Sequence, residues 1–190
     1  MTVLGHLDQH PGIDPPSFTA TVTAISADSI EMDETFYYPK GGGQPADKGT
    51  ITTDTFQCNV YDVAKKDSVF HMIDGINGVV NVGDRISCSI DTNWRNQLSA
   101  MHTAQHIISA LANEEWGADT VGNQIGFDRT RIDLKFENRD AFEANHLEEM
   151  VNDAIENNLL VSMDYRDSKE LIDDPLVRVN MERMPPNIDV

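Results

Sequence analysis

The chain has 190 residues, of which 39% are hydrophobic, and its 32 acidic residues outnumber its 14 basic ones to give a net charge of −18. This composition supports a packed core and argues against wholesale disorder. The charge argues against a plain basic nucleic-acid binder, although it allows one with a local basic strip.

The sequence shows no segment for membrane insertion or export. No apolar run is long enough to span a bilayer, and the N-terminus lacks the pattern of a signal peptide. The only cysteines, Cys58 and Cys88, form no disulfide framework, and we interpret each as a small buried hydrophobic residue. These features favour a cytoplasmic protein with no membrane partner.

The first half of the chain is patterned for strands. Residues 1–17 are predicted to be a loose lead-in with His6 and His10 in solvent, because the nearby glycines and Pro11 oppose a helix. Residues 18–91 carry short Thr-, Val- and Ile-rich runs at regular spacing, which is typical of a small barrel. The predicted strands are Phe18–Ile25, Ser29–Met32, Thr50–Thr53, Phe56–Val63, Val69–Ile73 (with His71 structural), Val79–Val82 and Arg85–Ile90, with turns at Asn77-Gly78 and Gly83-Asp84.

A glycine-rich loop interrupts these strands. The run Gly41–Gly43 bars regular structure and allows backbone N–H groups to approach a ligand closely. A flexible turn between strands is the simpler alternative. The aromatic residues before the glycines and the Gln44–Asp47 segment after them make the loop more specific than a linker.

The segment that follows residue 91 has helical periodicity. Asp91 or Thr92 can cap a helix that runs to Leu111. The residues spaced to face a core are Leu98, Met101, Gln105, Ile108 and Leu111. His102 and His106 are four residues apart, so their imidazoles lie on one helix face and can share a metal ion. The alternative is two unrelated histidines, and zinc needs about four ligands.

The remaining residues alternate between strand and helix patterns. Residues 92–190 are therefore predicted to form a two-layer α/β domain with two long helices, and the whole chain to be α+β. The predicted elements are a strand at Arg131–Phe136, a helix at Ala141–Asn157 capped by Asp140, a strand at Leu159–Asp167, a helical turn at Ser168–Asp173 and a strand at Val177–Met181.

This order of features resembles the alanyl-tRNA editing family, which comprises free-standing editing proteins and the editing region of alanyl-tRNA synthetase. Four matches occur in the family's order over roughly residues 18–182. They are the Gly-Gly-Gly-Gln loop in Phe36–Gly49, the zinc-binding helix at His102–His106, the glycine-containing segment Val121–Gly126 and the strand at Arg131–Asp133. The resemblance implies a translation-factor-type β-barrel followed by an α/β editing domain.

The resemblance also implies an activity. This is hydrolysis of the ester that joins serine or glycine to alanine tRNA, with His102 and His106 as zinc ligands. We assign catalytic roles to Gln44, Gly43 and Thr103, and substrate-binding roles to Gly41, Gly42, Asp47 and Arg131. Pairing of Arg131 with Asp133 within the sheet is an open alternative. A local strip for tRNA is predicted from Lys40, Lys48, Arg129, Arg131 and Lys135.

One departure from the family concerns zinc. The family's other ligands come from a downstream Cys-x-Gly-Thr-His-type motif, which these 190 residues do not contain. We therefore expect a chain truncated before that motif, with low zinc occupancy. A non-catalytic RNA-binding module that has lost its metal and an unrelated zinc hydrolase stay open as alternatives. The absence of a glutamate beside His102 argues against a His-Glu-x-x-His protease.

Overall fold

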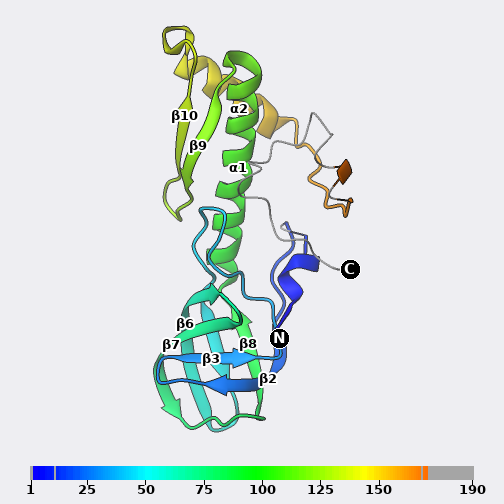
Figure 1. The fold of residues 1–190 in the computed structure, drawn as a ribbon, viewed down its shortest axis with the longest axis vertical. Helices are drawn as coiled ribbons and strands as arrows, with labels where there is room; N and C mark the ends of the chain where they lie inside the picture. The colour runs from blue at the N-terminus through cyan, green and yellow to red at the C-terminus, as the bar shows by residue number, and fades with distance from the viewer. Residues whose placement is uncertain (1, 11, 168, 171–190) are drawn as a thin grey trace. The chain divides into compact units, whose positions relative to one another are not determined.

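The computed structural model describes residues 2–10, 12–167, 169 and 170 (Figure 1). The chain divides into two compact units, Met1–Leu159 and Leu160–Val190. The strands and helices named below all lie in the first unit. Among the described residues, no helix combines the length and the hydrophobicity that crossing a membrane requires.

Six strands close into a barrel in the order β2-β3-β7-β6-β5-β8, and every neighbouring pair is antiparallel. Their bounds are Phe18–Ile25 (β2), Ser29–Met32 (β3), Gly49–Thr52 (β5), Phe56–Lys65 (β6), Val69–Gly78 (β7) and Arg85–Ile90 (β8). Along β8, every second residue is buried, so its apolar side chains fill the interior. The predicted barrel is confirmed, and it joins two helices in a mixed α+β fold.

The end of β7 differs from the prediction. The strand continues through Asn77 to Gly78, which pairs with Phe56 of β6, so the predicted turn at Asn77-Gly78 is wrong. A Cβ on Gly78 would lie 1.9 Å from the Thr55 carbonyl oxygen, so the glycine permits a close strand contact. The predicted strand Val79–Val82 is also wrong, because these residues form a loop before β8.

The N-terminal residues pack against the rest of the first unit. A short strand β1, Val3–Leu4, pairs in parallel with β4, Glu34–Thr35, and a 3₁₀ turn η1 follows at Gly5–Asp8. The His6 ring contacts the Tyr38 ring edge-on at 5.7 Å between centroids. Burial lowers the pKa of His6 to about 4, so the prediction of a solvated His6 is wrong.

The long helix α1 runs from Thr92 to Trp116. Asp91 caps it as predicted, since its Oδ1 accepts the Trp94 N–H at 2.9 Å. The helix continues five residues beyond the predicted Leu111 and ends at Gly117, which adopts a left-handed φ of 62°. Of the five positions predicted to face a core, Leu98 and Gln105 are buried and the others are half-buried.

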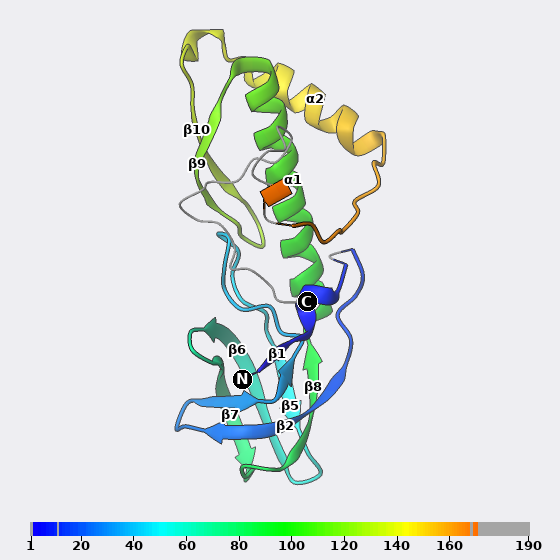
Figure 2. The ribbon, with the colours of Figure 1, turned by 45° about the vertical axis from the view of Figure 1, so that its right-hand side comes forward.

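A hairpin and a second helix pack against α1. Strands β9, Asp119–Gln124, and β10, Arg131–Lys135, pair antiparallel, and helix α2 runs from Ala144 to Glu156. Figure 2 shows α2 beside the C-terminal end of α1 and the hairpin along the length of α1. Their shared core contains Ala112, Ala118 and Leu147, surrounded by half-buried residues that include Trp116 and Leu134.

Two predictions in this region are wrong. Asp140 does not cap α2, because it belongs to a separate 3₁₀ turn η2, Arg139–Ala141, which Asn138 caps. The segment Leu159–Asp167 forms no strand, and Leu160 is 92% exposed. Alternation produces a strand only where a sheet edge is available for pairing, and none of the described ladders includes this segment. The elements predicted at Ser168–Asp173 and Val177–Met181 extend into or lie within residues outside the described part.

Candidate functional site: a glycine loop against a histidine pair

The glycine loop is a closed turn. The N–H of Gly41 donates to the Gln44 carbonyl at 3.2 Å, and the N–H of Gln44 donates to the Gly41 carbonyl at 2.9 Å. Gly42 and Gly43 occupy the two positions between them with φ of 58° and 82°, a conformation that favours glycine. The hydroxyl of Tyr38, which precedes the turn in the sequence, donates to the Gly41 carbonyl at 3.2 Å and so stabilises the turn.

A buried ion pair fixes the base of this loop to α1. Asp47 is fully buried, and its carboxylate accepts hydrogen bonds from the Arg95 guanidinium, with Nε–Oδ1 at 2.9 Å. The same carboxylate accepts the Tyr38 N–H at 2.7 Å, and Arg95 also donates to the Phe36 carbonyl at 2.8 Å. Asp47, for which we predicted a substrate-binding role, is thus a buried side chain whose contacts hold the loop. Sequence reasoning did not single out Arg95, which carries no recognisable motif.

The side chain of Gln44 joins the loop to the histidine pair. Its Oε1 lies 2.8 Å from Nδ1 of His102. Because an amide oxygen only accepts, Nδ1 of His102 carries the proton and Nε2 keeps its lone pair. The ring of His106 stacks on that of His102, with centroids 5.0 Å apart and planes 14° from parallel. Burial, with a smaller contribution from His106, lowers the pKa of His102 and favours its neutral form.

Strand β9 holds the loop from the other side. Asn123 Nδ2 donates to the Gly42 carbonyl and to Gln105 Oε1, at 3.2 Å in each case. The Ile125 N–H donates to the Gly43 carbonyl at 2.9 Å. Asn123 therefore bridges the loop and α1. The segment around Asn123 is one of the four family matches, but no local pattern identified this side chain.

Two other predicted residues make their hydrogen bonds elsewhere. Thr103 donates through Oγ1 to the Ser99 carbonyl of its own helix at 3.0 Å. Arg131 lies on the exposed surface of β10 and pairs with Asp133 at 3.0 Å, which is the alternative left open above. Neither residue has a hydrogen bond to the loop or to the histidines among the contacts of the described residues.

The two imidazoles of the histidine pair fit part of the ligand set of a zinc site. Imidazole nitrogen is a common zinc ligand, and a hydrogen bond to the other ring nitrogen typically orients such a ligand, as Gln44 does for His102. Within the described part of the chain, no three His, Cys, Asp or Glu residues are grouped to hold a metal. These residues thus supply two of about four ligands. Cys58 and Cys88 lie in the barrel core, where burial raises their pKa values to about 11 and about 12.

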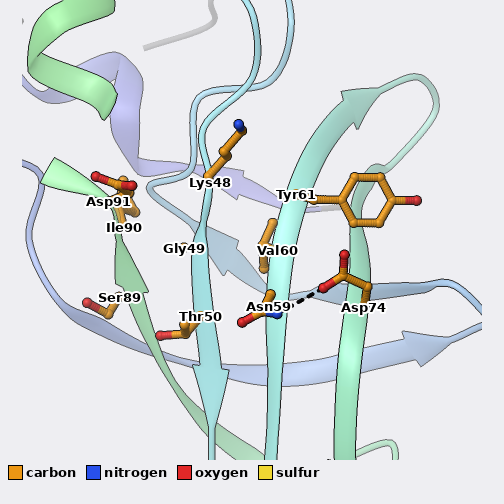
Figure 3. A pocket seen from close by; sticks show the side chains of 10 residues that line it. All are labelled: Lys48, Gly49, Thr50, Asn59, Val60, Tyr61, Asp74, Ser89, Ile90 and Asp91. Atoms are coloured by element: carbon orange, nitrogen blue, oxygen red, sulfur yellow. Dashed lines mark hydrogen bonds between the residues drawn. The ribbon is translucent and has the colours of Figure 1, made fainter. Parts of the chain in front are cut away.

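A hollow of about 430 Å³ lies elsewhere, on the wall of the barrel (Figure 3). Its lining comes mainly from β5, β6 and β8, and Asn59 Nδ2 donates to Asp74 across part of it at 2.9 Å. None of the residues predicted as catalytic, substrate-binding or metal-binding lines it. The chemistry suited to the predicted site is therefore at the loop and not in this hollow.

Known proteins share much of this sequence. A family profile described as tRNA synthetases class II (A) matches residues 13–94. The alanyl-tRNA editing protein AlaX-M of Methanosarcina barkeri is 35% identical over 144 residues, which are 73% of this chain and 59% of that protein. The alanine–tRNA ligase of Haloquadratum walsbyi is 38% identical over 145 residues, but they are only 15% of the ligase.

The extent of the match separates these two kinds of relative. The chain spans about three fifths of the M. barkeri editing protein and a small part of the ligase. The alanyl-tRNA editing protein AlaX-M of Methanosarcina acetivorans is 32% identical over 170 residues, which are 85% of this chain and 69% of that protein. Because this identity extends over most of both sequences, the chain belongs to the alanyl-tRNA editing family.

Proposed function

We propose that this chain hydrolyses the ester bond that joins serine or glycine to alanine tRNA, with zinc as its cofactor. The hydrogen bond between Gln44 and His102 carries the proposal, because it joins the glycine loop to the histidine pair. The editing proteins and ligases among the relatives support the substrate class.

Different residues of the chain have different roles in this reaction. His102 and His106 would hold the metal through ring nitrogens. Gln44 keeps the proton of His102 on Nδ1, so that Nε2 keeps the lone pair that can coordinate the metal. Zinc, when bound, supplies a Lewis acid that polarises the ester carbonyl or lowers the pKa of a water molecule.

The glycine loop offers backbone donors. Among the described residues, no acceptor is hydrogen-bonded to the N–H groups of Gly42 and Gly43, and both residues are exposed. These groups can stabilise the developing oxyanion of the ester or bind the terminal ribose. Both positions depend on glycine, because their φ values are positive.

Discrimination against correctly charged tRNA requires a group that recognises the serine hydroxyl. The Oε1 of Gln44 is occupied by His102, which leaves Nε2 of the same amide to donate to that hydroxyl or to a water molecule. A site built to bond a hydroxyl rejects the analogue that lacks it by ~10⁴-fold. Relative to Ser-tRNA, the chain is therefore expected to spare Ala-tRNA. This contact does not apply to a glycine substrate, which carries no hydroxyl.

The test is deacylation of Ser-tRNA for alanine by the chain supplied with zinc. His102→Ala should abolish the reaction, and Gln44→Ala should slow it less, by about 10–100-fold, because it loosens the orientation of a ligand. His146→Ala, an exposed histidine on α2, is the matched control and should keep wild-type activity.

Two outcomes would favour another function. Equal cleavage of small seryl esters and of Ser-tRNA would indicate a general zinc hydrolase. Binding of tRNA with no cleavage, even with zinc added, would indicate a non-catalytic module, an alternative that the two-ligand donor set of the described residues favours.

A further inference from the structure

Three lysines gather at the end of the barrel next to the glycine loop. The backbone N–H of Lys40, which directly precedes the glycines, donates to the Val63 carbonyl of β6 at 2.9 Å. Lys65 lies two residues further along β6, and Lys66 begins the turn to β7. All three lysines are exposed. Loop and strand end are therefore adjacent in space, although about 25 residues separate them in the sequence.

A bulge in β6 changes which side of the strand its last residues present. Before the bulge, the even-numbered residues Cys58 and Val60 are buried, and after it the odd-numbered Val63 is buried. The pairing with β7 shifts register between Val60 and Asp62, which accounts for the change. Lys65 thus follows Val63 on the inner side of the strand and is exposed where the strand leaves the barrel.

The electrostatics agree with this placement. Burial is the main cause of the lowered pKa of His6, and the positive charges of Arg95 and, to a smaller extent, Lys65 add to it. The His6 ring contacts Tyr38. Tyr38 in turn donates to the Gly41 carbonyl, so Lys65 lies on the loop side of the barrel end. The amine of Lys66 lies 5.9 Å from the centroid of the Phe70 ring.

The acidic residues nearby leave these lysines available. No ion pair among the described residues involves Lys40, Lys65 or Lys66. Asp62 uses Oδ1 to accept the Val63 N–H at 3.0 Å, and Asp67 is in the turn beside Lys66. The three cations therefore have no ion-pair partner among the described residues, in a chain whose net charge is −18.

We propose that Lys40, Lys65 and Lys66 bind the phosphate backbone of the RNA substrate beside the glycine loop. Because the whole chain repels a polyanion, attraction must come from a local excess of positive charge. This strip lies next to the loop that the proposed function assigns to the aminoacyl ester, so the inference rests on that function for its partner. This lysine strip shares Lys40 with the strip predicted from the sequence, and Lys65 and Lys66 are new to it.

The experiment measures binding of uncharged alanine tRNA to the full chain at several salt concentrations. The double variant K65Q/K66Q should bind more weakly, and the slope of log affinity against log salt should become shallower by about 1.5, since each phosphate contact contributes roughly 0.7–0.9. The control R85Q/R139Q removes the same charge from exposed arginines on β8 and η2, and it should keep the wild-type slope. Urea denaturation of each variant verifies that the fold is intact.

The outcomes separate this inference from the proposed function. An unchanged slope in K65Q/K66Q, an equal loss in R85Q/R139Q, or a wild-type chain that binds no tRNA would each overturn the strip. Deacylation is measured separately on Ser-tRNA. A chain that binds through the lysines but never cleaves would refute the proposed hydrolase and leave the strip supported.

Discussion

Asp47 shows how much a single carboxylate contributes to the site. It neutralises Arg95 in the interior and accepts the backbone N–H of Tyr38, so one side chain connects the loop to α1. Removing one member of such a pair leaves the other as a buried charge without a partner, which is the costly case. An exposed pair contributes little because water solvates and screens both charges.

At this scale we predict that Asp47→Ala lowers the free energy of unfolding by about 3–5 kcal/mol. The matched control is Asp133→Ala, which removes the exposed partner of Arg131 and should change stability by less than about 1 kcal/mol. Equilibrium urea denaturation of both variants measures the difference. Equal unfolding free energies for the two variants would contradict the buried role of Asp47.

Between elements, the glycine loop and β9 fit together tightly. A Cβ on Gly43 would lie 2.2 Å from Asn123 Oδ1, which is closer than atoms can approach. Asn123 would then have to leave the Gly42 carbonyl and Gln105, and the bridge from the loop to α1 would be lost. The close approach of loop and strand is thus one reason that this position is glycine.

We predict that Gly43→Ala destabilises the fold and removes Ser-tRNA deacylation. The control is Gly83→Ala, since Gly83 has a φ of 94° but nothing within 4 Å of its added Cβ. Backbone strain alone should reduce stability by about 1–2 kcal/mol in the control, and overpacking should add about 1–3 kcal/mol at Gly43. Thermal melting and the deacylation assay compare them. A Gly43→Ala variant that matches the control in both would show that the contact with Asn123 is unimportant.

At the scale of the whole molecule, one buried histidine makes stability depend on pH. His71 is fully buried, with Nδ1 donating to the Ile30 carbonyl at 3.0 Å and Nε2 accepting from Thr35 Oγ1 at 2.9 Å. Burial lowers its pKa from 6.5 to about 4. Between these values the unfolded chain binds the proton and the folded chain does not, so stability falls as pH decreases from 6.5 toward 4.

We predict that His71→Gln reduces this pH dependence. From pH 7 to pH 5, His71 should contribute a loss of about 2 kcal/mol, which the variant should not show. His6, whose pKa is also lowered to about 4, should keep a similar contribution in both proteins. Urea denaturation at the two pH values measures the difference. An identical loss in wild type and variant would contradict the role of His71.

The local features of this protein were predictable from its sequence. Short Thr-, Val- and Ile-rich runs at regular spacing indicated the barrel strands. In the structure, buried and exposed side chains alternate along most of β6 and all of β8, as expected for strands with one face in a core. The cap of α1 and the histidine pair were equally local, since both depend on residues within one or two turns of a helix. The roles assigned to the site residues remain predictions.

Only the tertiary structure decided which distant groups meet. Asp47 and Arg95 are 48 positions apart in the sequence, and Gln44 and His102 are 58 apart. The closed barrel and the loop bring the members of each pair together, and no local pattern encodes those contacts. The same reason explains the errors. The strand β7 passes through Asn77-Gly78 because β6 continues to pair with it, whereas the alternating segment Leu159–Asp167 forms no ladder among the described residues. Periodicity determines which face of a segment is apolar, but pairing depends on what the rest of the fold places beside it.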